Sequence, residues 1–230
     1  MMHFRSLIVA LAAAVIASPS AAGQEVKAPA KKKAANPAYA PVQDVPGLPR
    51  VLLIGDSISI GYTPPVRKLL AGQANVHRIP ENGGPTTNGV AKLEKWLGSG
   101  KWDAIHFNWG LHDLKLDTGA HQVPLEQYEK NLRALVKTMK GTGAKLIWAS
   151  TTPVPQGKVS PKRDPADVPK YNAAAKRIMD DEGVATNDLY TFALPRLKQL
   201  QQPVNVHFTE AGSAALADEV ARAISAALKK

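Results

Sequence analysis

The chain has 230 residues, no cysteine and a formal net charge of +10 at pH 7. Without cysteine, disulfide bonds, thiolate catalysis and cysteine-based zinc sites are excluded. Hydrophobic residues make up 44% and charged residues 21%, which is typical of a globular domain. The positive charge favours an anionic polysaccharide, cell wall or membrane as a neighbour, although a solvated basic face is the simpler explanation. No nucleic-acid-binding motif accompanies it, so nucleic acid is not an expected partner.

The first 22 residues have the pattern of a secretory signal peptide. Arg5 gives a positive start, residues 7–17 form an apolar stretch, and Ser20 and Ala22 supply small residues at the −3 and −1 positions of a cleavage site. The apolar stretch is too short for a convincing membrane span, and an uncleaved anchor is the alternative. We therefore expect a signal peptide over residues 1–22 and a mature chain that is secreted or periplasmic.

Residues 23–49 are rich in Ala, Pro and Lys, with a basic run at Lys31–Lys33. They show no apolar periodicity, so they are predicted to form a linker that buries too little surface to fold. The basic run is a candidate for association with an anionic cell-surface polymer. Residues 50–230 remain as one globular domain of ordinary size.

From residue 50 onward, strand-like and helix-like segments alternate. The unbroken apolar run over 51–54 is typical of a strand buried on both faces of a sheet. The clearest helix, over 124–140, has apolar residues three and four positions apart. The alternation predicts an α/β fold, with a parallel sheet of about five strands covered by helices on both faces. The predicted strands cover 51–54, 75–79, 102–109, 145–150 and 184–186, and the predicted helices cover 64–70, 88–97, 124–140, 168–182 and 210–228.

Gly55, Asp56 and Ser57 follow the first strand directly. Glycine allows a sharp turn at the strand end. The carboxyl edge of a parallel sheet is where α/β folds place their ligands. Ser57 is therefore a candidate nucleophile if a base reaches it, and the alternative is a serine that only caps the next helix.

Three further polar segments stand at predicted strand ends or before a helix, over 82–87, 110–113 and 205–209. We expect them to meet Ser57 at one edge of the sheet. The order of these segments resembles the SGNH hydrolases, also called GDSL esterases and lipases, over nearly the whole chain from residue 50. The resemblance implies a three-layer α/β/α sandwich of flavodoxin-like topology and an ester-hydrolysing activity.

The resemblance also implies roles for individual residues. Ser57 would be the nucleophile, and its N–H and that of Gly84 would donate to the oxyanion, with Gly83 as the alternative. The third segment places His112 where the family has Asn. The last segment keeps the family's His as His207.

The final segment also departs from the family, because Val204 stands where the family has the catalytic Asp. Without that acid, His207 needs another group to orient its ring. A main-chain carbonyl, the Asn205 side chain and Glu210 are all candidates, and we expect a Ser–His dyad. His112 can be a third oxyanion donor through a ring N–H.

Asp56, Asp113 and Asn205 are candidate supporting residues, and Asp113 is expected to brace its loop by hydrogen bonds. Taken alone, His207 has a simpler explanation as a histidine near a helix start. We expect a secreted, monomeric serine esterase without cofactor or metal ion, acting on a carbohydrate O-acetyl ester. The alternative is a carbohydrate-binding pseudoenzyme that lost catalysis together with the Asp.

Overall fold

The computed structural model describes residues 1–2 and 36–229. The chain divides into two units, and the globular unit covers residues 35–230. The predicted signal peptide and the linker up to residue 35 lie outside the described residues, apart from the first two. Among the helices that are described, none combines the length and the apolar character needed to cross a membrane.

Five parallel strands form the central sheet, as predicted. Their order is β2-β1-β3-β6-β7, so the chain starts near the middle and turns back after β2. This is the flavodoxin-like order, which leaves a crevice at the carboxyl ends of β1 and β3. The strands are β1 (Arg50–Ile54), β2 (Asn75–Arg78), β3 (Ala104–Phe107), β6 (Lys145–Ala149) and β7 (Ala185–Asn187).

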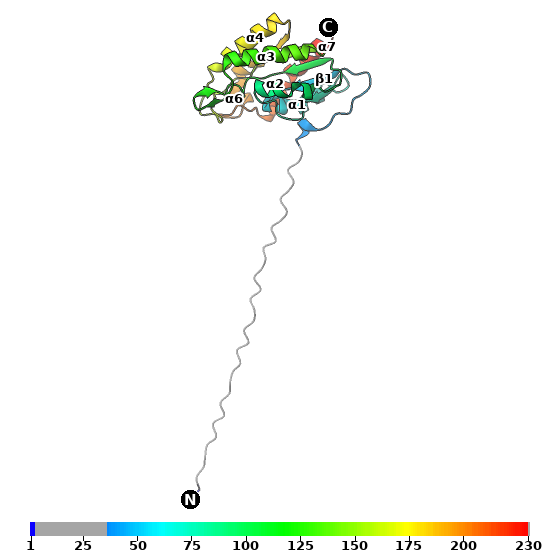
Figure 1. Ribbon diagram of the computed structural model, residues 1–230. Helices are drawn as coiled ribbons and strands as arrows, with labels where there is room; N and C mark the ends of the chain where they lie inside the picture. Colours follow the sequence, from blue (N-terminus) through cyan, green and yellow to red (C-terminus); the bar gives the residue numbers. More distant parts are fainter. Residues whose placement is uncertain (3–35, 230) are drawn as a thin grey trace. The chain divides into compact units, whose positions relative to one another are not determined.

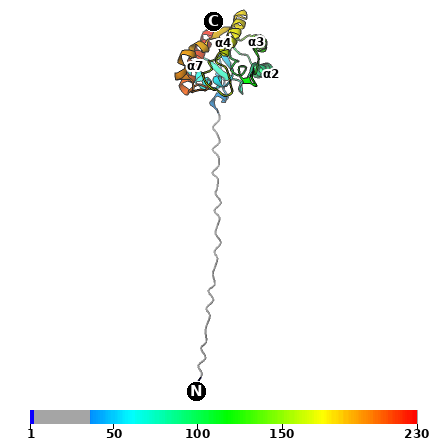
Figure 2. The ribbon, with the colours of Figure 1, turned by 90° about the vertical axis from the view of Figure 1, so that its left-hand side faces the viewer.

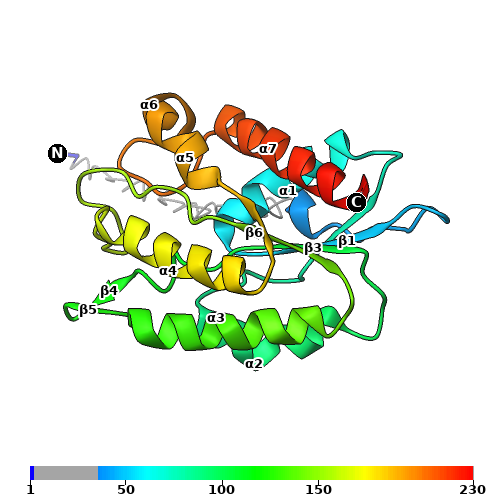
Figure 3. The same ribbon diagram turned by 90° about the horizontal axis from the view of Figure 1, so that it is seen from above.

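Helices cover both faces of the sheet, which confirms the three-layer prediction (Figures 1 and 2). In Figure 3 the sheet lies between α1 and α7 on one side and α2, α3 and α4 on the other. The three central strands β1, β3 and β6 are almost wholly buried, because both of their faces pack against helices, whereas the edge strand β7 exposes two of its three residues. These helices are α1 (Ser57–Leu69), α2 (Thr86–Leu97), α3 (Leu125–Lys140), α4 (Asp167–Asp181) and α7 (Glu210–Lys229).

The first helix begins seven residues before its predicted start at residue 64, which was wrong. Asp56 caps this helix, since its side chain accepts a hydrogen bond from the Ile58 N–H at 2.9 Å. The helix then continues through Pro64 and Pro65. Burial of an apolar stripe that includes Ile58 and Tyr62 compensates for the N–H groups that the prolines lack.

Several short elements were not predicted. A hairpin joins β4 (Leu116–Asp117) to β5 (Ala120–His121), and its turn places Thr118 and Gly119 at positive φ. That geometry is typical of two-residue hairpin loops. The remaining short elements are η1 (Pro37–Tyr39), α5 (Leu189–Ala193), η2 (Leu194–Arg196) and α6 (Leu197–Leu200).

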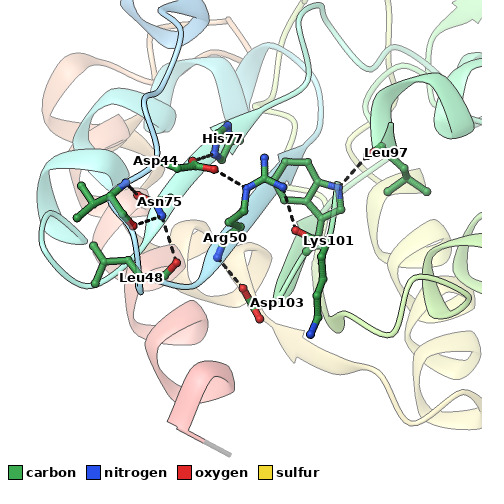
Figure 4. Close-up of polar contacts among 10 residues, drawn as sticks. Asp44, Leu48, Arg50, Asn75, His77, Leu97, Lys101 and Asp103 are labelled. Atoms are coloured by element: carbon green, nitrogen blue, oxygen red, sulfur yellow. Dashed lines mark hydrogen bonds and ion pairs between the residues drawn. The ribbon is translucent and has the colours of Figure 1, made fainter. Parts of the chain in front are cut away.

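Residues 36–49, which the sequence analysis assigns to the linker, belong to the same compact unit as the rest of the domain, although most of their side chains are exposed. Asp44 accepts a hydrogen bond from Arg50 at 2.7 Å and pairs with the ring of His77 at 2.5 Å (Figure 4). The Asn75 side chain accepts from the Val45 N–H at 2.9 Å. Because Asn75 and His77 belong to the edge strand β2, these contacts attach the segment to the edge strand of the sheet. Composition could not reveal these specific pairings.

Candidate active site

Ser57 is the first residue of α1 and follows the turn at the end of β1. Gly55 makes this turn tight, because an added Cβ would lie 2.9 Å from the Ser59 hydroxyl. Arg78 holds the turn by donating to the main-chain oxygens of Gly55 and Asp56 at 3.1 and 3.2 Å. The structure brings the Ser57 Oγ within 2.9 Å of the His207 Nε2, although these residues are 150 positions apart.

Asn205 orients the His207 ring. Its Oδ1 atom lies 2.7 Å from the His207 Nδ1 and also accepts the His207 main-chain N–H at 3.0 Å. The second bond identifies this atom as the amide oxygen, so the nearby ring nitrogen must carry a proton. Nε2 is then unprotonated in the neutral ring and can accept the Ser57 proton. Of the three candidates for replacing the missing acid, the structure therefore selects the Asn205 side chain.

Val204, at the position of the family's Asp, faces solvent with 52% of its surface exposed. Its φ of 49° lies in the left-handed region, which a β-branched residue rarely adopts. Asn205 follows Val204 directly. The group that orients the His207 ring therefore stands one residue after the position where the family has its Asp.

His112 lines the same cavity as Ser57 and His207. The Nζ of Lys115 lies 2.9 Å from the His112 Nδ1. An ammonium group can only donate, so Nδ1 accepts and the ring proton resides on Nε2. Burial lowers the pKa of His112, and the positive charges of Lys115 and Arg163 add to this against the opposing charge of Asp56. The ring is thus held neutral with an Nε2–H donor, which suits an oxyanion donor and not a base.

The predicted glycine donors are both engaged in hydrogen bonds. The Gly84 N–H donates to the Asn82 side-chain oxygen at 2.9 Å, and Gly84 has a φ of +63°. For Gly84 to donate to an oxyanion, the Asn82 side chain must turn away. The Gly83 N–H donates to the Gly55 main-chain oxygen at 2.9 Å, which commits Gly83 to holding the nucleophile turn.

Asp113 is fully buried and braces its loop. Its Oδ1 accepts the main-chain N–H and the hydroxyl of Thr86 at 2.8 and 2.6 Å, and Asn131 donates to the same hydroxyl at 3.0 Å. This ties the loop after β3 to the start of α2. Burial raises the pKa of Asp113 to about 7, although the bonds from Thr86 oppose the shift.

Gly110 fixes the path of the same loop. Its φ is +156°, and an added Cβ would lie 2.0 Å from the Thr151 hydroxyl oxygen. No other residue fits this position without displacing the neighbouring loop.

The two cationic residues of the cavity, Lys115 and Arg163, were not named as site residues by the sequence analysis. Lys115 follows the third polar segment closely, and Arg163 lies in the loop before α4. Within the described part of the chain, no group of three His, Asp or Glu residues is placed to hold a metal ion. The cavity has a volume of about 230 Å³ and is lined by Asp56, Ser57, Asn82, Leu111, His112, Lys115, Ser160, Pro161, Arg163, Val206 and His207.

Comparisons with known proteins agree with this geometry. The model of the GDSL-like Lipase/Acylhydrolase family matches residues 53–215. A lipase/acylhydrolase from Enterococcus faecalis has a TM-score of 0.69 and 21% identity, covering 78% of this chain and 96% of that one. The acetyl xylan esterase AlAXEase has a TM-score of 0.67 and 18% identity, covering 76% and 99%.

An acetylxylan esterase from Geobacillus stearothermophilus has a TM-score of 0.65 and 22% identity, covering 76% of this chain and 94% of that one. At these identities the structural likeness shows the fold, and the family match carries the assignment. The comparison with curated protein sequences gives no match. The chain belongs to the GDSL-like lipase/acylhydrolase family and is a carboxylic ester hydrolase.

Proposed function

We propose that this protein removes O-acetyl groups from a carbohydrate outside the cytoplasm, by a Ser57–His207 mechanism. The observation that carries the mechanism is the 2.9 Å contact between the Ser57 Oγ and the His207 Nε2. This contact places a proton acceptor on the hydroxyl, which is the requirement for a serine nucleophile.

In the first half of the reaction, the Ser57 Oγ attacks the ester carbonyl carbon while the His207 Nε2 takes the hydroxyl proton. The tetrahedral intermediate collapses, the carbon–oxygen bond to the sugar breaks, and the imidazolium returns its proton to the leaving alcohol. Water then attacks the acetyl carbonyl carbon while His207 takes a proton from it. The bond between that carbon and the Ser57 Oγ breaks, the imidazolium returns the proton to Oγ, and acetate leaves. Asn205 keeps the ring in the required tautomer throughout, but it offers no charge to stabilise the imidazolium.

Three N–H groups are proposed to stabilise the oxyanion. The Ser57 N–H stands at the start of α1, where helix N–H groups lack intrahelical partners. The His112 Nε2–H is available because Lys115 occupies the other ring nitrogen. The Gly84 N–H becomes available once the Asn82 side chain turns away. Donors fixed before the reaction lower the barrier most effectively.

The acyl group and the substrate class are inferred from separate observations. The cavity of about 230 Å³ lies below the range usual for drug-sized ligands, which favours a short acyl group such as acetyl. Two of the structurally similar enzymes named above are acetyl xylan esterases. The predicted signal peptide over residues 1–22 supports an extracellular or periplasmic carbohydrate as substrate.

A fluorophosphonate probe and acetate release together test this proposal. We expect the probe to label Ser57 and the protein to release acetate from an O-acetylated polysaccharide, and Ser57→Ala should abolish both. If neither labelling nor acetate release occurs while the protein still binds the polysaccharide, the pseudoenzyme alternative is correct.

A further inference from the structure

The cavity beside Ser57 carries more positive charge than ester hydrolysis requires. Its lining includes the cations Lys115 and Arg163 and one carboxylate, Asp56. The Asp56 carboxylate is already used, because it accepts the Ile58 N–H at the start of α1. With the two imidazoles neutral, the lining has a net charge of +1.

Arg163 is nearly buried, with 5% of its surface exposed. Its Nε donates to the Leu111 main-chain oxygen at 2.5 Å, and its Nη1 donates to that of Pro161 at 3.1 Å. These bonds hold the guanidinium in place without neutralising it. Among the described residues, no carboxylate forms an ion pair with Arg163 or with Lys115.

Lys115 is held in the same way. One of its three N–H bonds is directed to the His112 Nδ1, and two remain for another acceptor. Burial lowers the pKa of Lys115 and the charge of Arg163 lowers it further, while the charges of Asp56 and Asp113 oppose the shift in part. The two cations therefore repel each other, and a further anion beside them would relieve this repulsion.

Exposed basic residues elsewhere are partnered differently. Arg133 pairs with Asp181 and Arg177 pairs with Glu129, on surfaces where water already screens the charge. The nearly buried Arg163 lacks such screening, so leaving its charge without a counterion is costly. A carboxylate entering the cavity would meet this need, since its two oxygens match the geometry of a guanidinium and an ammonium.

From these contacts we propose that the preferred ester carries a carboxylate on the same sugar ring as the acetylated hydroxyl, as an O-acetylated uronic acid residue does. The carboxylate binds against Lys115 and Arg163 while the ester carbonyl lies between Ser57 and His207. This inference rests on the proposed esterase activity and narrows its substrate class to acidic sugars.

A pair of small esters tests the charge preference directly. 4-Acetoxybenzoate carries a carboxylate, and 4-acetoxybenzamide is its neutral counterpart of similar shape. Each kcat/KM is divided by the rate of hydroxide-catalysed hydrolysis of the same ester, which removes the difference in leaving-group reactivity. We expect the corrected ratio to favour the carboxylate by about tenfold or more, as for hydrogen bonds to charged groups, and to fall as salt is raised.

Variants of Lys115 and Arg163 test whether these two cations cause the preference for the carboxylate ester. Lys115→Met and Arg163→Lys should each reduce the ratio severalfold, whatever they do to the absolute rates. Lys162→Met is the matched control, because Lys162 is an exposed neighbour in the same loop that does not line the cavity. The same preference should appear as faster acetate release from O-acetylated galacturonan than from O-acetylated xylan.

The outcomes distinguish a failure of the carboxylate subsite from a failure of the proposed esterase activity. Equal corrected rates for both aryl esters, together with equal acetate release from both polysaccharides, would overturn the carboxylate subsite and leave the esterase intact. An unchanged ratio in Lys115→Met and Arg163→Lys would also overturn it. If the protein hydrolyses none of these esters and Ser57 resists the fluorophosphonate probe, the proposed function fails and the substrate class fails with it.

Discussion

Two histidines of this protein each contact a side-chain oxygen, one from a carboxylate at the edge of the sheet and the other from an amide in the active site. His77, on the edge strand β2, lies 2.5 Å from the carboxylate of Asp44. His207, at the carboxyl edge of the sheet, lies 2.7 Å from the amide of Asn205. The pair that looks like the Asp–His half of a catalytic triad touches no serine, while the pair without a carboxylate contacts the Ser57 hydroxyl.

This difference separates two functions of the acid in a triad. One function is to fix the ring tautomer, and any oxygen acceptor at the right place does this. The other is to stabilise the imidazolium, which needs a negative charge. Asn205 supplies the first function only. Asp44 could supply both, but its carboxylate is shared with Arg50 and holds the N-terminal segment on the sheet (Figure 4).

The largest expected effect comes from removing the His207 ring. His207→Ala should lower kcat for p-nitrophenyl acetate by about 10³-fold or more, because the hydroxyl of Ser57 then has no proton acceptor. His77→Ala is the matched control, and it should leave kcat within about twofold, since the ring contacts Asp44 and Trp102 and does not line the cavity. Turnover that survives His207→Ala would show that another group is the base.

The second effect concerns the oxyanion donor. His112→Ala should lower kcat by about 10²–10³-fold with little change in KM, because the lost bond matters most in the transition state. His112→Asn should recover much of the loss, since an amide N–H can donate from a similar place. If His112→Asn is as inactive as His112→Ala while His207→Ala remains active, the roles of the two histidines are reversed.

Lys115 gives this prediction a further test, because it sets the His112 tautomer. On a neutral ester, Lys115→Met should lower kcat by about tenfold in the native chain. In the His112→Asn background it should have little effect, since an amide has no tautomer to set. Equal losses in both backgrounds would mean that Lys115 acts only through packing or charge.

Exchanging the amide of Asn205 for a carboxylate, and the carboxylate of Asp44 for an amide, tests whether the charge of the partner matters to each histidine. Asn205→Asp keeps an oxygen near the His207 Nδ1 and adds the missing charge, so kcat should rise by about tenfold. Asn205→Ala should lower kcat by about 10–100-fold, because the ring loses its only side-chain partner besides Ser57 among the described residues. Asp44→Asn at β2 should not change kcat. A fall in kcat with Asn205→Asp would show that the neutral partner is needed.

Much of the fold was predictable because it depends on apolar runs that are read directly from the sequence. The unbroken run over 51–54 and the periodic stripe of α3 both correspond to observed elements. The packed segment over 36–49 was not predictable, because a few specific pairs hold it and its composition resembles a linker. The pairing of Asp44 with His77 spans 33 positions and follows no periodicity.

The active site, like the fold, was only partly predictable from the sequence. The order of polar segments placed Ser57, His112 and His207 in one cavity, as the structure does. The choice of Asn205 over Glu210 depends on the local turn that brings the Asn205 amide oxygen to the His207 ring, and the residue pattern does not specify that geometry. The role of Lys115 depends on a turn after β3 that brings positions three apart into contact.

Two aspartates, Asp44 and Asp113, have pKa values that folding shifts in opposite directions, so they contribute to stability at different pH. Desolvation would raise the pKa of Asp44, but His77 and Arg50 lower it below its ordinary value of 3.8. Burial raises the pKa of Asp113 from 3.8 to about 7. In the unfolded chain Asp113 ionises near pH 4, whereas in the folded chain it ionises near pH 7. Its contribution to stability is therefore present below pH 4 and lost as the pH rises to about 7.

The smallest expected effect follows from these opposite pKa shifts. It is a change in the pH dependence of thermal stability, not in activity. In thermal unfolding between pH 4 and 7, Asp113→Asn should flatten the decline in Tm, because an amide still accepts from Thr86 and cannot ionise. Asp44→Asn should leave that decline unchanged and weaken stability only above pH 4, where the Asp44 carboxylate is charged in both states and its contacts are complete. An equal decline in the native chain and in Asp113→Asn would show that folding does not raise the pKa of Asp113.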